Sequence, residues 1–160
     1  MNDHLIRPSA GPGVTMSVTP ESAGWTYLSF AVVELEAGGT HRSLLSDQET
    51  AVVPLRGEGR VRVGDLEADL SRTDVFDEMP RVAYAPPGVE IEIIAGAGFE
   101  FAIGSAPAEG LHPPRIFAPG EMKSEVRGGG AALRQVNHVL APPLPAERLI
   151  LYEVYVPRGS

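Results

Sequence analysis

The residues of this chain that could do chemistry begin with His41 and Glu49, which stand between two apolar runs. Imidazole and carboxylate groups are ordinary ligands of divalent metals, and either could also move a proton of a small substrate. A well-held metal needs three or four converging ligands, however, and the residues after His41 are Arg42 and Ser43. We therefore predict that this chain holds no metal. His41 is then a rim or structural residue, and Glu49 is a solvated residue at the start of a strand.

The remaining titratable candidates are isolated. His112 in Leu-His-Pro-Pro and His138 in Val-Asn-His-Val are better explained as a loop residue and a strand-face residue than as catalytic groups. Glu90 and Glu92 could form an acid and base pair, but strand alternation places both on the solvent face. The chain has no cysteine and no Ser-His-Asp order with a nucleophile-elbow motif. The sequence therefore leaves the catalytic residues unknown.

Composition limits the class of protein. With 160 residues the chain suits one domain, and its 18 Gly and 15 Pro favour short strands joined by tight turns. The net charge of -8 argues against binding to nucleic acid or to an anionic membrane, which requires clustered Lys and Arg. No apolar stretch approaches a membrane span, and the N-terminus lacks the apolar core of a signal peptide. We expect a cytoplasmic protein without nucleic-acid or membrane partners.

The elements that must position these residues are predicted to be strands. No segment shows the apolar spacing of a helix, so we expect almost no helix beyond a turn near Ser43 to Glu49 or Ala146 to Arg148. Residues 1–24 are predicted to form an arm with one short strand. The predicted strands, including two hairpins with turns at Gly57-Glu58-Gly59 and Gly96-Ala97-Gly98, are Val14 to Val18, Trp25 to Leu35, Thr50 to Leu55, Arg60 to Val63, Leu66 to Leu70, Val89 to Ile93, Phe99 to Ile103, Ala132 to Leu140 and Leu149 to Val156.

The order of these segments resembles the cupins, small double-sheet β-barrels of the jelly-roll type. In that family two histidines spaced His-X-His and a glutamate point inward and hold a metal. Here the pair is reduced to His41-Arg42-Ser43, and the second motif, matched by Pro86-Pro87-Gly88, has Ile91 at its histidine position. The resemblance implies an all-β cupin-type barrel whose metal site is broken.

Further blocks resemble the 5-deoxy-glucuronate isomerase family of bacterial inositol catabolism. They follow one another in the order of that family and cover most of the chain. The blocks are Gly24 to Phe30, Arg72 to Asp77, Tyr84 to Pro87, Arg127-Gly128, Arg134 to Val136, Ala146 to Leu149 and Glu153 to Pro157. Members of the family are bicupins about twice this length, so the resemblance implies the N-terminal cupin half only.

What this resemblance implies is an aldose-ketose isomerase that converts 5-deoxy-glucuronate to 5-dehydro-2-deoxy-gluconate. Residues 25–157 would form a single cupin-like domain, and residues 158–160 a tail or truncation point. A divalent metal would belong to the absent C-terminal cupin, with no cofactor in this chain, which alone would be inactive. The alternative is a stand-alone, non-catalytic cupin that binds a sugar acid or mediates dimerisation.

Two expectations concern partners. A small sugar acid, if it binds, would meet His41, Glu49, Arg81 and Tyr84 at the barrel mouth. The strand from Leu149 to Val156 is apolar on both faces, with only Glu153 charged, so one face needs a partner. We expect that strand to contact a second cupin domain or a second copy in a two-fold dimer.

Overall fold

The computed structural model describes residues 5–158, so the first four residues of the predicted arm and the last two of the predicted tail lie outside the described residues. Eleven strands are present among them, and no helix there is long and apolar enough to cross a membrane. The strands are β1 (Gly13–Val18), β2 (Ser29–Glu36), β3 (Thr40–Ser43), β4 (Gln48–Val63), β5 (Leu66–Arg72), β6 (Val82–Ala85), β7 (Ile91–Pro107), β8 (Arg115–Phe117), β9 (Lys123–Arg127), β10 (Arg134–Leu140) and β11 (Leu151–Tyr155).

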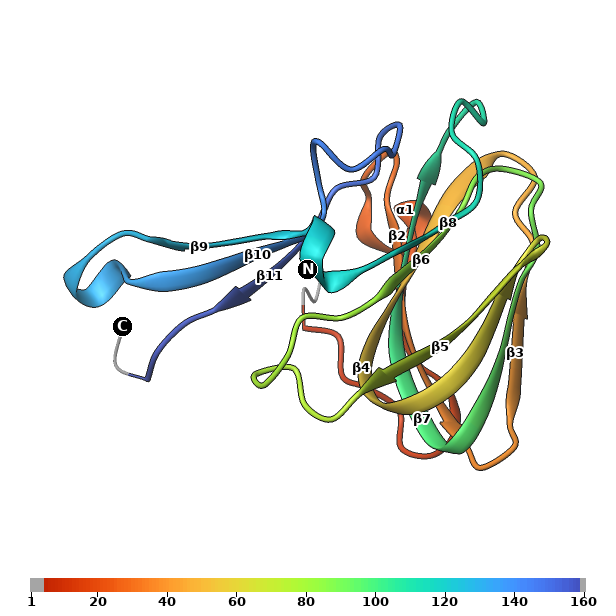
Figure 1. The fold of residues 1–160 in the computed structure, drawn as a ribbon, viewed down its shortest axis with the longest axis horizontal. Coiled ribbons are helices and arrows are strands. Elements are labelled where there is room, and N and C mark those ends of the chain that lie inside the picture. The colour runs from red at the N-terminus through yellow and green to blue at the C-terminus, as the bar shows by residue number, and fades with distance from the viewer. Residues whose placement is uncertain (1–4, 159–160) are drawn as a thin grey trace.

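Two strands, β4 and β7, organise the barrel. They pair antiparallel along their whole length, and each bends from one layer of the barrel into the other. One layer has the order β1-β2-β7-β4-β6-β8, and the other has β3 beside β7 and β5 beside β4. The strands β9, β10 and β11 form a separate three-stranded sheet that projects away from the barrel (Figure 1). The predicted all-β double-sheet fold is confirmed.

Both predicted hairpins are wrong, because each is one continuous bent strand. The segment Gly57-Glu58-Gly59 lies inside β4, and Gly96-Ala97-Gly98 lies inside β7. The register between β4 and β7 shifts between Pro54 and Arg56 and again between Glu58 and Gly59, so bulges rather than turns absorb the bend. Gly57 has φ 88°, and a Cβ there would lie 2.1 Å from the Gly98 carbonyl oxygen. The glycines permit two backbones to touch at the bend.

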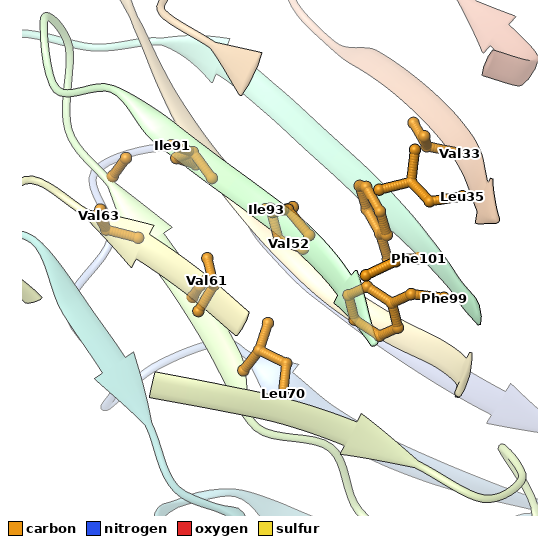
Figure 2. Packing of buried hydrophobic residues seen from close by; sticks show 13 residues of the cluster. Val33, Leu35, Val52, Val61, Val63, Leu70, Ile91, Ile93, Phe99 and Phe101 are labelled. Atoms are coloured by element: carbon orange, nitrogen blue, oxygen red, sulfur yellow. The ribbon is translucent and has the colours of Figure 1, made fainter. Parts of the chain in front are cut away.

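The interior holds the larger of two apolar clusters. It is built from alternate residues of the strands in both layers, with Phe99 and Phe101 packed ring to ring at 5.1 Å (Figure 2). The second cluster lies on the outer face of the first layer, beneath the C-terminal segment. Its buried members are Ala51, Val53, Val82, Tyr84, Ala106, Phe117, Val139, Leu140 and Leu149. Residues 51–54 are therefore buried on both faces of β4, which explains their continuous apolar run.

The short helices do not form where the sequence predicts them. The described α-helix is α1 (Pro20–Ala23), where the Thr19 hydroxyl accepts from the Ser22 N–H and Gly24 ends the helix in the left-handed region. Two 3-10 turns, η1 (Pro119–Glu121) and η2 (Gly130–Ala132), are the others among residues 5–158. Residues 43–49 and 146–148 are not helical. Local capping chemistry, rather than apolar spacing, decides such single turns.

The solvent-face prediction for Glu92 is also wrong, although Glu90 is exposed as predicted. Glu92 is only 7% exposed, because Arg42 from β3 and Arg62 from β4 cover its carboxylate from the two neighbouring strands. The Arg42 Nε atom donates to Glu92 Oε1 at 2.7 Å. Alternation correctly places Glu92 away from the barrel interior, but cross-strand pairing on that outer face buries it.

Candidate functional site

The four residues predicted to line one barrel mouth do not meet there. His41 lies opposite Ile93 on β7, whereas Glu49 lies opposite Ala106, thirteen positions further along the same strand. Because strands rise about 3.3 Å per residue, this separation is on the order of 40 Å along the bent strand. Tyr84 lies beside Glu49, and Arg81 is exposed at a third place.

Glu49 and Tyr84 face outward from the first layer. Directly opposite residues of paired strands point to the same face, and Glu49 is opposite Ala106 while Tyr84 is opposite Ala51. Both alanines belong to the outer cluster under the C-terminal segment rather than to the barrel interior. A glutamate that ligated a metal inside the barrel would need the opposite orientation.

The Glu49 carboxylate is fully buried and holds the C-terminal segment against the barrel. Its Oε2 atom accepts from the Tyr84 hydroxyl at 2.8 Å and from the Glu147 backbone N–H at 2.9 Å. Its Oε1 atom accepts from the backbone N–H groups of Arg148 at 2.7 Å and Leu149 at 2.5 Å. A carboxylate has about four lone-pair sites, so these four donors saturate it.

The side chain of Glu147 continues this chain of contacts. It accepts from three successive backbone N–H groups, those of Glu109, Gly110 and Leu111, at 2.8, 2.6 and 2.7 Å. These backbone hydrogen bonds, that of Glu109 foremost, lower the pKa of the Glu147 carboxyl. Two carboxylates, Glu49 and Glu147, thus join the barrel, the C-terminal segment and the loop after β7. Burial, reinforced by Glu49, raises the pKa of the Tyr84 phenol, which keeps it a donor.

His41 lies at the inner cluster, half-buried against Phe101, with the two rings edge to face at 5.7 Å. Burial lowers the pKa of His41, so its imidazole is neutral near pH 7. Ile91, at the second-motif histidine position, is 1% exposed and fills the same core. Among residues 5–158 no three His, Cys, Asp or Glu side chains converge in a way that could hold a metal. The donor set present does not fit a cupin metal.

An arginine that the sequence analysis missed makes the second buried polar centre. The side chain of Arg72, at the end of β5, is 0% exposed and lies 2.5 and 2.9 Å from the two carboxylate oxygens of Glu153 on β11. It also donates to the carbonyls of Pro54, Val75 and Glu78. The alternation of β5, with Leu70 and Arg72 both inward, could have revealed it. So could Glu153, the single charge of an apolar strand.

Tyr155 completes this cluster. Its hydroxyl oxygen lies 2.7 Å from the Val75 carbonyl, 2.6 Å from Glu153 Oε2 and 3.2 Å from an Arg72 guanidinium nitrogen. Burial, together with Glu153, raises the pKa of Tyr155 to about 12. Burial lowers the pKa of Arg72, but the hydrogen bonds and charge of Glu153 outweigh it and raise the pKa overall. This buried ion pair fastens β11 to the barrel.

One predicted site residue, Arg81, lines an open groove. The groove has a volume of about 410 Å³ and lies where β5 and β8 come together without forming a described ladder. Arg81 makes no hydrogen bond or ion pair with the described residues, and Arg115 across the groove pairs with Glu121. Its other lining residues are Leu66, Glu67, Ala68, Ile116 and Ala118. A guanidinium without a partner in such a groove could bind a carboxylate.

The other two predicted histidines lie as expected, His112 in a loop and His138 on a face of β10. His138 Nε2 lies 2.9 Å from Glu125 Oε1, and its ring packs edge to face on Tyr152 at 4.8 Å. Glu125 also contacts Lys123 and Arg127, and these partners, Lys123 first, lower the pKa of Glu125 to about 2. The cluster is a surface charge network on the three-stranded sheet.

Comparisons with known proteins agree on one family. The sequence profile of the KduI/IolB family matches residues 4–160. The 5-deoxy-glucuronate isomerase of Geobacillus kaustophilus is 36% identical over 98% of this chain and 59% of its own length. That of Geobacillus thermodenitrificans is 36% identical over 92% of this chain and 55% of its own length. The chain thus spans less than two thirds of these relatives.

Solved structures give the same answer for the fold. An IolB-like protein from Salmonella typhimurium superposes with a TM-score of 0.92 at 28% identity, over 97% of this chain and 60% of that one. A Bacillus subtilis oxalate decarboxylase superposes with a TM-score of 0.50 at 17% identity over 63% of this chain, a likeness of fold alone. The cupin-type β fold and the resemblance of the sequence blocks are both confirmed.

Proposed function

Because the chain belongs to the KduI/IolB family, we propose that it is the N-terminal cupin part of a 5-deoxy-glucuronate isomerase and that its part in the enzyme is architectural. The expected reaction is the aldose-ketose shift from 5-deoxy-glucuronate to 5-dehydro-2-deoxy-gluconate in inositol catabolism. The relatives of this name support the proposal, and the portion of their length that this chain does not span would carry the chemistry.

The reaction itself sets what a catalytic site must supply. An aldose-ketose shift moves a proton between adjacent carbons, so it needs a base near the carbon and an electrophile near the carbonyl oxygen. A metal ion often serves as that electrophile, but the described residues do not fit one. Glu49 is saturated by four donors, and His41 is neutral and has no acid beside it on the inner cluster. Residues 5–158 therefore offer no matched acid and base.

The observation that carries the proposal is the use of Glu49. Glu49 is the residue that the resemblance to the cupins offers as an acidic ligand, but its carboxylate faces out of the barrel and accepts hydrogen bonds from three backbone N–H groups of residues 147–149. It therefore joins the barrel to the segment that leads into β11. The same residue type has a binding role in the cupin motif and a structural role here.

The test compares the purified chain with the full-length Geobacillus kaustophilus relative in one isomerase assay. We expect turnover by the relative and none by this chain, and elemental analysis of the dialysed chain should show no stoichiometric zinc, manganese or iron. Turnover by the chain that disappears in His41→Ala would place chemistry in this half. One metal ion per chain would show that this cupin does hold a metal and would refute the architectural role proposed for the chain.

A second candidate function, sugar-acid binding without catalysis, is favoured by the groove beside Arg81. A carboxylate would pair with this free guanidinium, while Glu67 could accept from sugar hydroxyls. Calorimetric titration with glucuronate is the direct measurement. The matched control is Arg56→Ala, which changes an arginine on the exposed side of β4. Loss of glucuronate binding in Arg81→Ala, with binding kept in Arg56→Ala, would support this function. No heat of binding with the parent chain would exclude it.

A further inference from the structure

The groove between β5 and β8 lies at the seam between the two layers of the barrel. β5 is the last strand of one layer, and β8 is the last strand of the other. The lining residues belong to these two strands and to the segments next to them, so the barrel alone shapes the groove. Its volume of about 410 Å³ lies near the lower end of the range for small-molecule pockets, which suits a ligand of monosaccharide size.

Two arginines line this groove, and they differ in their availability. Arg81 immediately precedes β6 and is exposed, and it forms no hydrogen bond or ion pair with the described residues. Arg115 on β8 makes two contacts of its own. It pairs with the Glu121 carboxylate, and its guanidinium carbon lies 4.9 Å from the centre of the Phe117 ring. A ligand in the groove therefore meets one free guanidinium rather than two.

The carboxylate that occupies Arg115 is itself held in place. Glu121 is the last residue of the turn η1, and its Oε2 atom accepts from the Ala118 backbone N–H at 2.8 Å. Its Oε1 atom accepts from the Arg115 guanidinium. Hydrogen bonds to a charged carboxylate are stronger than those between neutral groups. These two contacts fix the Glu121 carboxylate beside Arg115, where it cancels the charge of the guanidinium.

The charges around the groove limit the charge of a ligand. Glu67 lines the side formed by β5, and its carboxylate lies 3.3 Å from Arg60. A carboxylate ligand brings one negative charge, which Arg81 can balance. A phosphate monoester brings about 1.5 to 2 negative charges near pH 7, and the excess would face Glu67 and Glu121 without a second free cation.

We propose that Glu121 is a specificity-determining residue, which by occupying Arg115 makes the groove select sugars with a single carboxylate over sugar phosphates. This selectivity rests on the sugar-acid binding proposed above for the same groove. A planar carboxylate can pair with Arg81 through two parallel hydrogen bonds. Release of Arg115 from Glu121 would supply the second cation that a phosphate requires.

The experiment uses glucuronate, glucose and glucose 6-phosphate, which share one pyranose ring and differ at carbon 6. That carbon carries a carboxylate, a hydroxyl or a phosphate monoester. Calorimetric titrations of this chain at one ionic strength compare the affinities. Glucuronate should bind at least about tenfold more tightly than either other sugar. Equal affinity for glucuronate and glucose 6-phosphate would overturn the selectivity and leave sugar-acid binding in place, whereas no binding of glucuronate would overturn both.

Glu121→Gln tests the role of this residue. Glutamine can still accept from the Ala118 N–H, but its neutral amide no longer cancels the charge of Arg115. Glucose 6-phosphate should then bind at least about tenfold more tightly than to the parent chain, and adding Arg115→Gln should remove this gain.

The matched control is Glu58→Gln, which removes the same charge from an exposed glutamate outside the groove and should leave the three affinities unchanged. Circular dichroism and thermal melts establish that the variants fold. Unchanged binding of glucose 6-phosphate by Glu121→Gln, or an equal gain in Glu58→Gln, would refute the role of Glu121.

Discussion

Replacing Glu49 by glutamine tests the structural role of this carboxylate directly. The side chain keeps its size, but it loses its charge and one of its acceptor oxygens becomes an NH₂ donor. The favourable orientation turns this NH₂ toward Tyr84, whose hydroxyl can rotate and accept. The Glu147 backbone N–H then loses its acceptor, while the N–H groups of Arg148 and Leu149 bond to a neutral oxygen instead of a charged one.

The magnitude follows from these three changes. An unsatisfied buried donor costs about 1–3 kcal/mol, and each hydrogen bond that loses its charge weakens by about 1 kcal/mol. We expect Glu49→Gln to lower the free energy of unfolding by about 4 kcal/mol. For a domain of this size the loss corresponds to a decrease of roughly 10 °C in Tm.

The assay is urea unfolding followed by circular dichroism, combined with hydrogen exchange. The matched control is Glu58→Gln, an exposed glutamate of the same strand β4 that forms no hydrogen bond or ion pair with the described residues, and it should change stability by less than about 0.5 kcal/mol. Exchange of the amides of residues 147–149 should accelerate in Glu49→Gln. Equal stability of the two variants, or unchanged protection of these amides, would refute the reasoning.

Three further predictions concern other parts of the chain. Tyr155 should ionise near pH 12 in a near-ultraviolet absorbance titration, and Tyr155→Phe should remove that step. Because the pKa of Tyr155 in the folded protein is raised above 10.0, the contribution of this residue to stability is complete below pH 10.0 and is lost as the pH rises toward 12. An ionisation of Tyr155 at pH 10.0 would contradict the burial of its hydroxyl. The pKa of His41 measured by NMR should lie below 6.5, because burial disfavours the charged ring. The contribution of His41 to stability is therefore present above pH 6.5 and is lost as the pH falls. A titration midpoint above pH 6.5 would show that the ring is not desolvated. Gly57→Ala should lower the free energy of unfolding by about 3 kcal/mol, because the added Cβ would overlap the Gly98 carbonyl. Gly88→Ala, also at positive φ but in open space, should lower it by about 1 kcal/mol in the same unfolding assay. Similar losses in the two variants would show that the backbones are not in contact at the bend.

The sequence by itself determined the class of fold and most of the strands. Alternating and β-branched residues predicted β1, β2, β5, β10 and β11 close to their observed positions, because period-2 burial is a local property of a strand. The resemblance of short ordered blocks also indicated the family correctly. Loss of the metal motif was visible in His41-Arg42-Ser43 and Ile91, since ligand chemistry depends on residue type.

Tertiary structure decided what the glycine segments and the charged residues do. A Gly-Glu-Gly sequence permits either a turn or a bulge, and only the pairing of β4 with β7 along their full length selected the bulge. The backbone partners of Glu49 lie 98 to 100 positions away, and the ion-pair partner of Arg72, Glu153, lies on β11. Local periodicity can place such a side chain on a face of its strand, but which backbone covers that face depends on how distant strands pack.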